Sequence, residues 1–178
     1  MVNDVIFMKR LTRFIVSIDR NGLLWLTDFR HPYVNRAMES ASRLGDWDAW
    51  TLLLAGLLLP KGRFKASRKR AARAALPKIL FALGVCYAIK RVARRARPSV
   101  TVEGFSTLVT DPDPYSFPSS HAATSWAAYI AIAREFGGLA WFLTIPAVLI
   151  SYSRMHVGAH YPLDVLIGTG IGVGIGFV

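Results

Sequence analysis

The sequence predicts an all-α integral membrane protein, a bundle of about five transmembrane helices that follows an amphipathic interfacial segment. Hydrophobic residues make up 53% of the 178 residues, although 19% are charged, and the mean hydropathy is positive. This length is typical of one domain, and this apolar content is high for a soluble one. We therefore divide the chain into interfacial helices at residues 1–45 and a membrane core at residues 46–178.

Residues 4–44 place apolar and charged side chains on different sides of a helix. Phe7, Leu11 and Phe14 share one side, and basic residues lie elsewhere. This pattern is typical of a helix lying on a membrane surface or on the helix bundle. Charged residues interrupt every apolar stretch before residue 20, so we expect no signal peptide. His31-Pro32 should break the segment, because the residue before proline avoids helical geometry.

Five apolar segments follow, at residues 47–60, 74–89, 122–133, 136–152 and 162–178. Most contain fewer apolar residues than the roughly 20 that span a bilayer, so a soluble helical bundle stays an alternative. The uncharged segment 136–152 favours the membrane, because it is apolar all round. The glycine-rich segment 162–178 suits close helix packing in lipid.

A formal net charge of +11 predicts an anionic partner, which could be nucleic acid, lipid headgroups or a phosphorylated substrate. Nucleic acid is disfavoured, because the basic residues are not interleaved with aromatic ones. The single cysteine, Cys86, can form no intramolecular disulfide, and its apolar surroundings predict a small buried side chain.

The first polar motif runs from Lys90 to Pro98, after an apolar helix. Lys90, Arg94 and Arg97 recur at helical spacing, so we expect them on one face, with the helix ending at Arg97 before the proline. Such a cluster could also be a basic flank that binds headgroups. Arg91 and Arg95 lie off that face and are expected to meet headgroups or solvent.

The second motif, Phe117-Pro118-Ser119-Ser120-His121, precedes an alanine-rich helix. Free backbone N–H groups at a helix start can bind an anion, although an ordinary Ser-capped helix would look the same. The third motif is Ser153-Arg154, followed by His160 and Asp164. A carboxylate one turn from a histidine can orient the imidazole for nucleophilic attack. His156 and His160 have a spacing that would also suit zinc, but no further ligands are evident.

The three motifs, in this order over residues 90–164, resemble the signature of the type 2 phosphatidic acid phosphatase superfamily. The superfamily includes lipid phosphatases, glucose-6-phosphatase, soluble acid phosphatases and vanadium haloperoxidases. The apolar segments here indicate the membrane lipid phosphatase branch. The resemblance implies a helical core that binds phosphate and a lipid phosphomonoester or diphosphate as substrate, for example phosphatidic acid, phosphatidylglycerophosphate or a polyprenyl phosphate.

The resemblance also implies residue roles. His160 would form a phosphohistidine, Asp164 would orient it, and His121 would protonate the leaving oxygen and later activate water. Phosphate oxygens would be bound by Lys90, Arg97, Ser119, Ser120 and Arg154. Serine at position 120 departs from the usual glycine but keeps the backbone N–H. Since the cations can supply the positive charge, we expect no metal and no other cofactor.

The expected partners are a lipid phosphate and the bilayer, with no nucleic acid. A catalytically silent membrane protein that holds anionic lipid is the alternative. The basic connection at residues 61–73 predicts a cytoplasmic location for that loop, and hence an active site on the outer face of a bacterial cytoplasmic membrane. The basic residues around Lys90 favour the opposite orientation.

Overall fold

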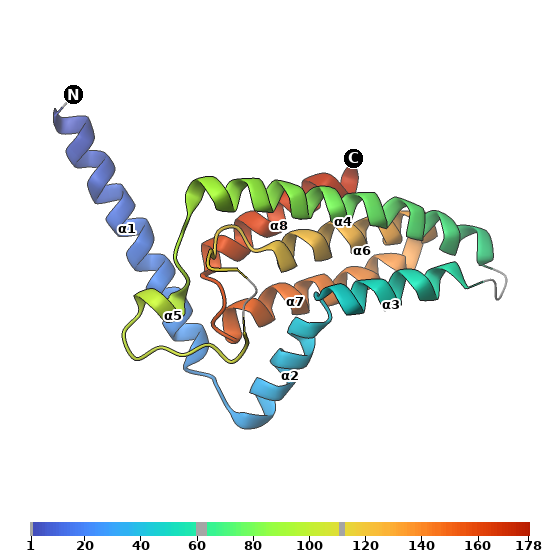
Figure 1. Cartoon of the computed structure of the whole chain (residues 1–178), viewed down its shortest axis with the longest axis horizontal. Helices are drawn as coiled ribbons and strands as arrows, with labels where there is room; N and C mark the ends of the chain where they lie inside the picture. The colour runs from blue at the N-terminus through green and yellow to red at the C-terminus, as the bar shows by residue number, and fades with distance from the viewer. Residues whose placement is uncertain (1, 60–63, 111–112) are drawn as a thin grey trace.

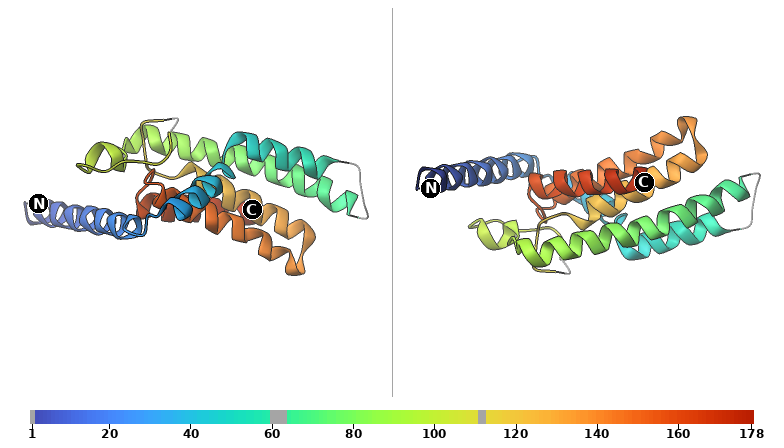
Figure 2. Two further views of the ribbon diagram at one scale, coloured as in Figure 1. Left: turned by 90° about the horizontal axis from the view of Figure 1, so that it is seen from below. Right: turned by 90° about the horizontal axis from the view of Figure 1, so that it is seen from above.

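The computed structural model describes residues 2–59, 64–110 and 113–178, and this part of the chain is helical (Figure 1). Most of the helices run along the long axis of the molecule, whereas α1 extends away from the bundle at the end where α6 and α8 begin (Figures 1 and 2). The elements are α1 (Val2–Thr27), α2 (Pro32–Arg43), α3 (Trp47–Leu58), α4 (Lys65–Ala93), α5 (Pro98–Thr101), α6 (Ser120–Phe136), the 3-10 helix η1 (Gly138–Thr144), α7 (Ile145–His156) and α8 (Pro162–Phe177).

Helix α6 lies at the centre and contacts α4, α7 and α8. Small side chains let these helices approach closely. On α6 the buried alanines include Ala122, Ala123, Ala127 and Ala128. On α8, an added Cβ at Gly168 would collide with the Ser119 carbonyl, and Gly172 and Gly176 also face α6 at close range. The expected close packing of this glycine-rich segment is therefore confirmed.

Two predicted helices have different boundaries in the structure. Helix α4 ends at Ala93, and Arg94 takes a left-handed conformation with φ 48°. The predicted common helical face of Lys90, Arg94 and Arg97 is therefore wrong, because the chain leaves the helix before Arg97. The segment 136–152 is also not one helix, since Gly137 and Gly138 have positive φ and α7 begins only at Ile145.

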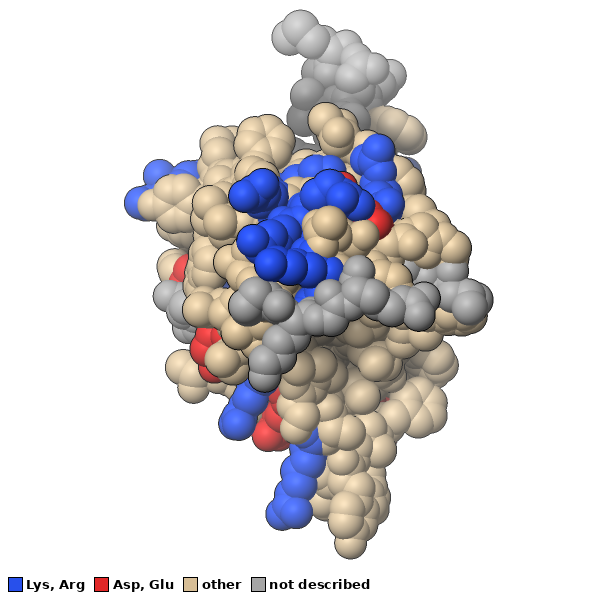
Figure 3. All heavy atoms as spheres, turned by 90° about the vertical axis from the view of Figure 1, so that its right-hand side faces the viewer, with Lys and Arg blue, Asp and Glu red and all other residues tan. Residues whose placement is uncertain are grey.

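By length and hydropathy, α4 is the one helix among the described residues that could cross a membrane, while α3 and α8 are shorter apolar helices. Exposed apolar side chains follow several helices, including Leu80 and Phe81 on α4, Val148 and Leu149 on α7, and Leu166 and Ile167 on α8. Lys and Arg gather at the end of the molecule where α4 begins (Figure 3). The basic residues of this end of α4 include Lys65, Lys69, Arg70 and Arg73.

Candidate active site

The three sequence motifs meet at the end of the bundle opposite to the start of α4. Helices α4 and α7 end there, and α6 and α8 begin there (Figure 1). Between them lies a cavity of about 160 Å³, which also borders the start of α3. Its lining residues include Asp46, Lys90, Arg97, Asp113, Ser120, His121, Arg154 and His160. The structure thus brings together residues that are up to 114 positions apart, from Asp46 to His160.

Two buried cations of the cavity bind one carboxylate. Lys90 and Arg97 are each only 5% exposed. The Lys90 Nζ lies 3.1 Å from both carboxylate oxygens of Asp113, and the Arg97 Nη2 lies 3.3 Å from Oδ1. An isolated bridge between Ala96 and Tyr115 holds these two chain segments side by side. Burial alone would raise the pKa of Asp113, yet the charges of Lys90 and Arg97 and the N–H of Tyr115 hold it below its ordinary value.

His160 lies beside this pair and is 2% exposed. Its Nδ1 lies 2.7 Å from the Ser116 carbonyl oxygen, which can only accept, so Nδ1 carries the proton. Its Nε2 lies 3.5 Å from the Arg97 Nη1, a donor, so Nε2 presents a lone pair. Burial lowers the pKa of His160 well below 6.5, and the charges of Arg154, Arg97 and Lys90 lower it further. The imidazole is therefore neutral at pH 7, as a nucleophile must be.

Asp164 is fully buried one turn after His160, but its carboxylate is not within hydrogen-bonding distance of that ring. Oδ2 lies 3.8 Å from the His160 Nδ1 and instead accepts from the Tyr161 N–H at 2.9 Å. Oδ1 accepts from Arg95 at 2.7 Å. Arg95 also binds Asp19 of α1 at 2.6 Å. The expectation that Arg95 meets headgroups or solvent is therefore wrong, because it joins two buried carboxylates.

The serine motif forms the start of α6. The Ser119 side chain caps the helix by accepting from the Ala122 N–H at 3.4 Å, and the Ser119 N–H donates to the Asp164 carbonyl oxygen at 2.9 Å. Ser119 is fully buried, whereas Ser120 lines the cavity. Ser120 and His121, at this helix start, line the same cavity as the cations Lys90, Arg97 and Arg154, an arrangement that suits an anion.

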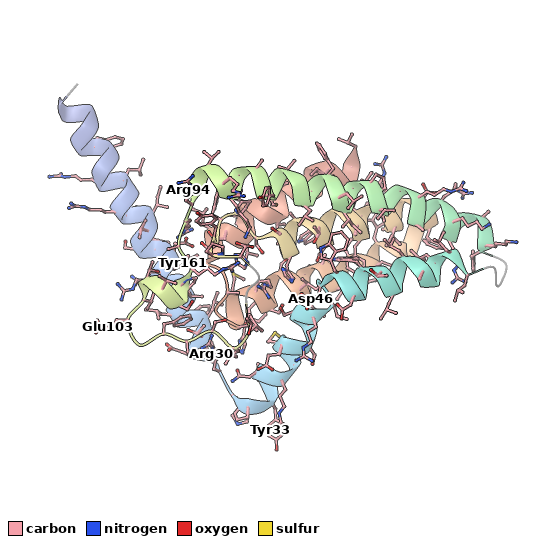
Figure 4. All side chains as sticks on the ribbon, in the orientation of Figure 1. Arg30, Tyr33, Asp46, Arg94, Glu103 and Tyr161 are labelled. Carbon is pink, nitrogen blue, oxygen red and sulfur yellow. The ribbon has the colours of Figure 1, made fainter. Side chains whose placement is uncertain are left out.

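The N-terminal helices also reach the site. The His121 Nε2 lies 2.8 Å from Asp46 Oδ1, at the corner between α2 and α3 where Figure 4 labels Asp46. Arg154 is 4% exposed and donates to Ser42 of α2 at 2.6 Å. His156 does not join His160 in a common site, since its Nε2 contacts Asn35 of α2 at 3.0 Å. Among the described residues, no three His, Cys, Asp or Glu side chains are grouped to hold a metal.

A sequence profile of the PAP2 superfamily matches residues 72–178, which is more than half of the chain and includes all three motifs. The chain belongs to the PAP2 superfamily. Within it, the chain is similar to an undecaprenyl-diphosphatase of Sulfolobus acidocaldarius, with 32% identity over 82% of this chain and 68% of that protein. A decaprenylphosphoryl-5-phosphoribose phosphatase of Mycobacterium tuberculosis is 37% identical over 51% of this chain. That alignment spans 49% of the mycobacterial protein, about half its length.

Two solved PAP2 structures have the same fold. A transmembrane phosphatidylglycerolphosphate phosphatase from Bacillus subtilis superposes with a TM-score of 0.74 and 22% identity, covering 92% of this chain and 83% of that one. Aquifex aeolicus LpxE superposes with a TM-score of 0.76 and 25% identity, covering 88% of this chain and 91% of that one. Both likenesses cover more of the chain than residues 72–178, so the shared fold includes part of the chain before residue 72.

Several residues of this PAP2 site are outside the three motifs. Asp113 lies in a turn-rich connection, where the sequence gives only proline and aspartate turn signals. Asp19 interrupts the apolar face that Ile15, Ile18 and Gly22 form on α1, and a lone acidic residue on such a face is a signal for a buried partner. Asp46 has no comparable signal, because an aspartate before Trp47 looks like an ordinary helix start.

Proposed function

We propose that this PAP2 protein hydrolyses a lipid phosphomonoester or diphosphate through a phosphohistidine at His160. The observation that carries the proposal is a neutral, buried imidazole surrounded by three cations that are each at least 95% buried, namely Lys90, Arg97 and Arg154. Phosphoryl transfer depends mainly on positioning and on positive charge around the transferred group. The site combines both with a nucleophile of the required protonation state.

In the proposed first step, the Nε2 lone pair of His160 attacks phosphorus, and the bond from phosphorus to the lipid oxygen breaks. The Ser116 carbonyl holds the Nδ1 proton and stabilises the charge that the ring acquires. His121 gives a proton to the leaving oxygen. Lys90, Arg97 and Arg154 neutralise the phosphoryl oxygens, so the proposed reaction needs no metal ion.

In the second step, water attacks the phosphohistidine and loses a proton to His121, which frees His160 and releases inorganic phosphate. Asp164 contributes a negative charge 3.8 Å from the His160 ring. Its backbone carbonyl binds the Ser119 N–H and so joins the start of α6 to the start of α8. Ser119 would therefore hold the helix that carries Ser120 and His121, and Ser120 would contact the phosphate directly.

The relatives support a lipid phosphate as substrate, because their names include a polyprenyl diphosphatase and a decaprenylphosphoryl sugar phosphatase. We further propose that this PAP2 protein is embedded in a membrane as a bundle of about five helices, although among the described helices α4 alone is long and apolar enough to cross by itself. The exposed apolar side chains of α4, α7 and α8 support this proposal, as does the likeness to a transmembrane phosphatase. The basic end of α4 would lie on the cytoplasmic side and the active site on the outer side.

The test is phosphate release by the purified protein from a panel of lipid phosphates in detergent, with and without a chelator. The panel contains phosphatidic acid, phosphatidylglycerophosphate, a polyprenyl phosphate and a polyprenyl diphosphate. Turnover should persist in EDTA and fall about a thousand-fold or more in His160→Ala, whereas the exposed His31→Ala should match the unaltered protein. Acid-labile labelling of the unaltered protein by a ³²P substrate should likewise disappear in His160→Ala. Lipid binding without turnover would contradict the proposal and favour a silent lipid-binding protein.

A further inference from the structure

The corner between α2 and α3 is built around the His121 ring. Asp46 Oδ1 lies 2.8 Å from His121 Nε2, and an added Cβ at Gly45 would lie only 2.7 Å from His121 Cδ2. The corner is held in place by Trp50, which is 3% exposed and donates from its indole N–H to the Gly45 carbonyl at 3.1 Å. The close approach requires glycine at position 45. One edge of the ring is thus fixed by residues outside the PAP2 motifs.

The Asp46 carboxylate does not cap the helix that it precedes, α3. Asp46 is the N-cap residue of α3, a position where aspartate normally accepts from backbone N–H groups of the first turn. Here the side chain makes no capping hydrogen bond. Such a bond stabilises a helix, so a purely structural aspartate would be expected to make it. The carboxylate instead binds His121, and this hydrogen bond lowers the pKa of Asp46 against the effect of burial.

From this geometry we infer that Asp46 is a positioning residue for proton transfer by His121, with Gly45 as its steric support. This role rests on the proposed function. A carboxylate only accepts, so Nε2 keeps its proton, and Nδ1 becomes the atom that exchanges protons with the reactants. Nδ1 is the ring atom opposite the Cδ2–Nε2 bond that faces the corner. Asp46 also stabilises the doubly protonated ring, as a carboxylate does for the imidazolium of a catalytic triad.

The proton balance follows from this assignment. While phosphorus transfers to His160, the imidazolium of His121 gives its Nδ1 proton to the oxygen of the departing alcohol and becomes neutral. When water attacks the phosphohistidine, the Nδ1 lone pair accepts a proton from that water. His121 is then an imidazolium again, and Asp46 has held the Nε2 proton throughout both steps.

The test compares two esters that differ in their need for an acid. Dodecyl phosphate releases an aliphatic alkoxide that must be protonated, whereas p-nitrophenolate leaves without a proton because it is a weak base. In Asp46→Asn we expect kcat for dodecyl phosphate to fall about 30-fold with little change in KM, since general acid catalysis contributes about 10²–10⁴-fold. With p-nitrophenyl phosphate, the pre-steady-state burst of p-nitrophenol should keep its amplitude. The rate constant of this burst should change by less than about three-fold.

The controls separate this role from folding and from the proposed function. Asp48 is an exposed carboxylate that accepts from the neighbouring Ala49 N–H. The matched variant Asp48→Asn should behave as the unaltered protein. Gly45→Ala should also lower kcat for dodecyl phosphate selectively, because the Cβ of the introduced alanine would displace the His121 ring. Equal losses on both esters, or no loss on either, would overturn the inference. Failure of the unaltered protein to hydrolyse both esters would overturn the proposed function instead.

Discussion

At the scale of single residues, Asp113 binds two of the cations that the proposed phosphate would need. Its carboxylate binds Lys90 and Arg97, and it lies in the same cavity as His160. A phosphate that binds these cations must displace the carboxylate or share the cations with it, and the two anions repel each other. Asp113 therefore weakens the binding of every phosphate, including the product.

Replacing this carboxylate should strengthen inhibition by the product. In Asp113→Asn we expect the inhibition constant of inorganic phosphate to fall about ten-fold, because a hydrogen bond to a charged group contributes about 1.5–3 kcal/mol. Steady-state inhibition in detergent measures this. Glu103→Gln, which removes an exposed carboxylate from the neighbouring loop, serves as the matched control (Figure 4). Unchanged or weaker inhibition in Asp113→Asn would show that the carboxylate does not compete with phosphate.

The depressed pKa of His160 has a consequence for stability. The folded imidazole resists a proton that the unfolded chain accepts near pH 6.5. Its contribution to stability is therefore fully present above pH 6.5 and is lost as the pH falls toward the lower folded pKa. The midpoint of thermal unfolding should be compared between the unaltered protein and His160→Gln at several pH values. As the pH falls from about 6.5 to 4.5, the unaltered protein should lose stability relative to His160→Gln. A difference that stays constant over this window would contradict the prediction.

At the scale of helices, Arg95 joins α1 to the start of α8. It binds Asp19 at 2.6 Å and Asp164 at 2.7 Å, and its guanidinium lies 4.1 Å from the centre of the Tyr161 ring. Asp19 in turn accepts from the Leu163 N–H at 2.8 Å, in the first turn of α8. The N-terminal segment, which was expected to lie on the membrane surface or on the bundle, thus supports α8, the helix that begins just after His160.

Removing the Arg95 cation should lower the stability of the protein and also slow the release of phosphate. In Arg95→Ala two buried carboxylates lose a partner, and breaking such a buried pair costs about 3–5 kcal/mol. We expect a lower thermal midpoint and reduced phosphate release, measured side by side. Arg94 is the neighbouring exposed residue. The control variant Arg94→Ala should change the thermal midpoint and the rate of phosphate release much less than Arg95→Ala does. If both variants unfold at the same temperature, Arg95 does not support the site in this way.

At the scale of the whole molecule, the two ends of the bundle differ in chemistry. One end carries the active site, and the other carries the basic start of α4 (Figure 3). The cations that line the cavity, Lys90, Arg97 and Arg154, are inside the protein, whereas Lys69 and Arg73 at the other end are exposed. Arg91 and Arg94 are exposed at the active-site end. Exposed charges near helix ends determine orientation, so the basic end of α4 should lie in the cytoplasm.

Introduced thiols can measure this orientation in intact cells. A membrane-impermeant maleimide should label the exposed Glu103→Cys, at the active-site end, without permeabilisation. It should label Ala66→Cys, at the basic end, only after permeabilisation. The native Cys86 is buried and provides a low background in both variants. The reverse pattern would place the active site in the cytoplasm.

The helical class and the family could be predicted from the sequence alone, and both are confirmed. The sequence also predicts which residues form the proposed phosphate site. Motif spacing predicts Lys90, Arg97, His121 and His160 as site residues, because each lies near a helix end and the proposed chemistry needs these residue types. It could not reveal Asp46, Asp113 or Arg95 as partners, since ion pairs across the fold leave no local pattern. The contacts of Asp164 with Arg95 and of Asp46 with His121 became visible in the folded structure and not before. Both pairings depend on which buried charges meet when the helix ends converge, and packing fixes this rather than spacing along the chain.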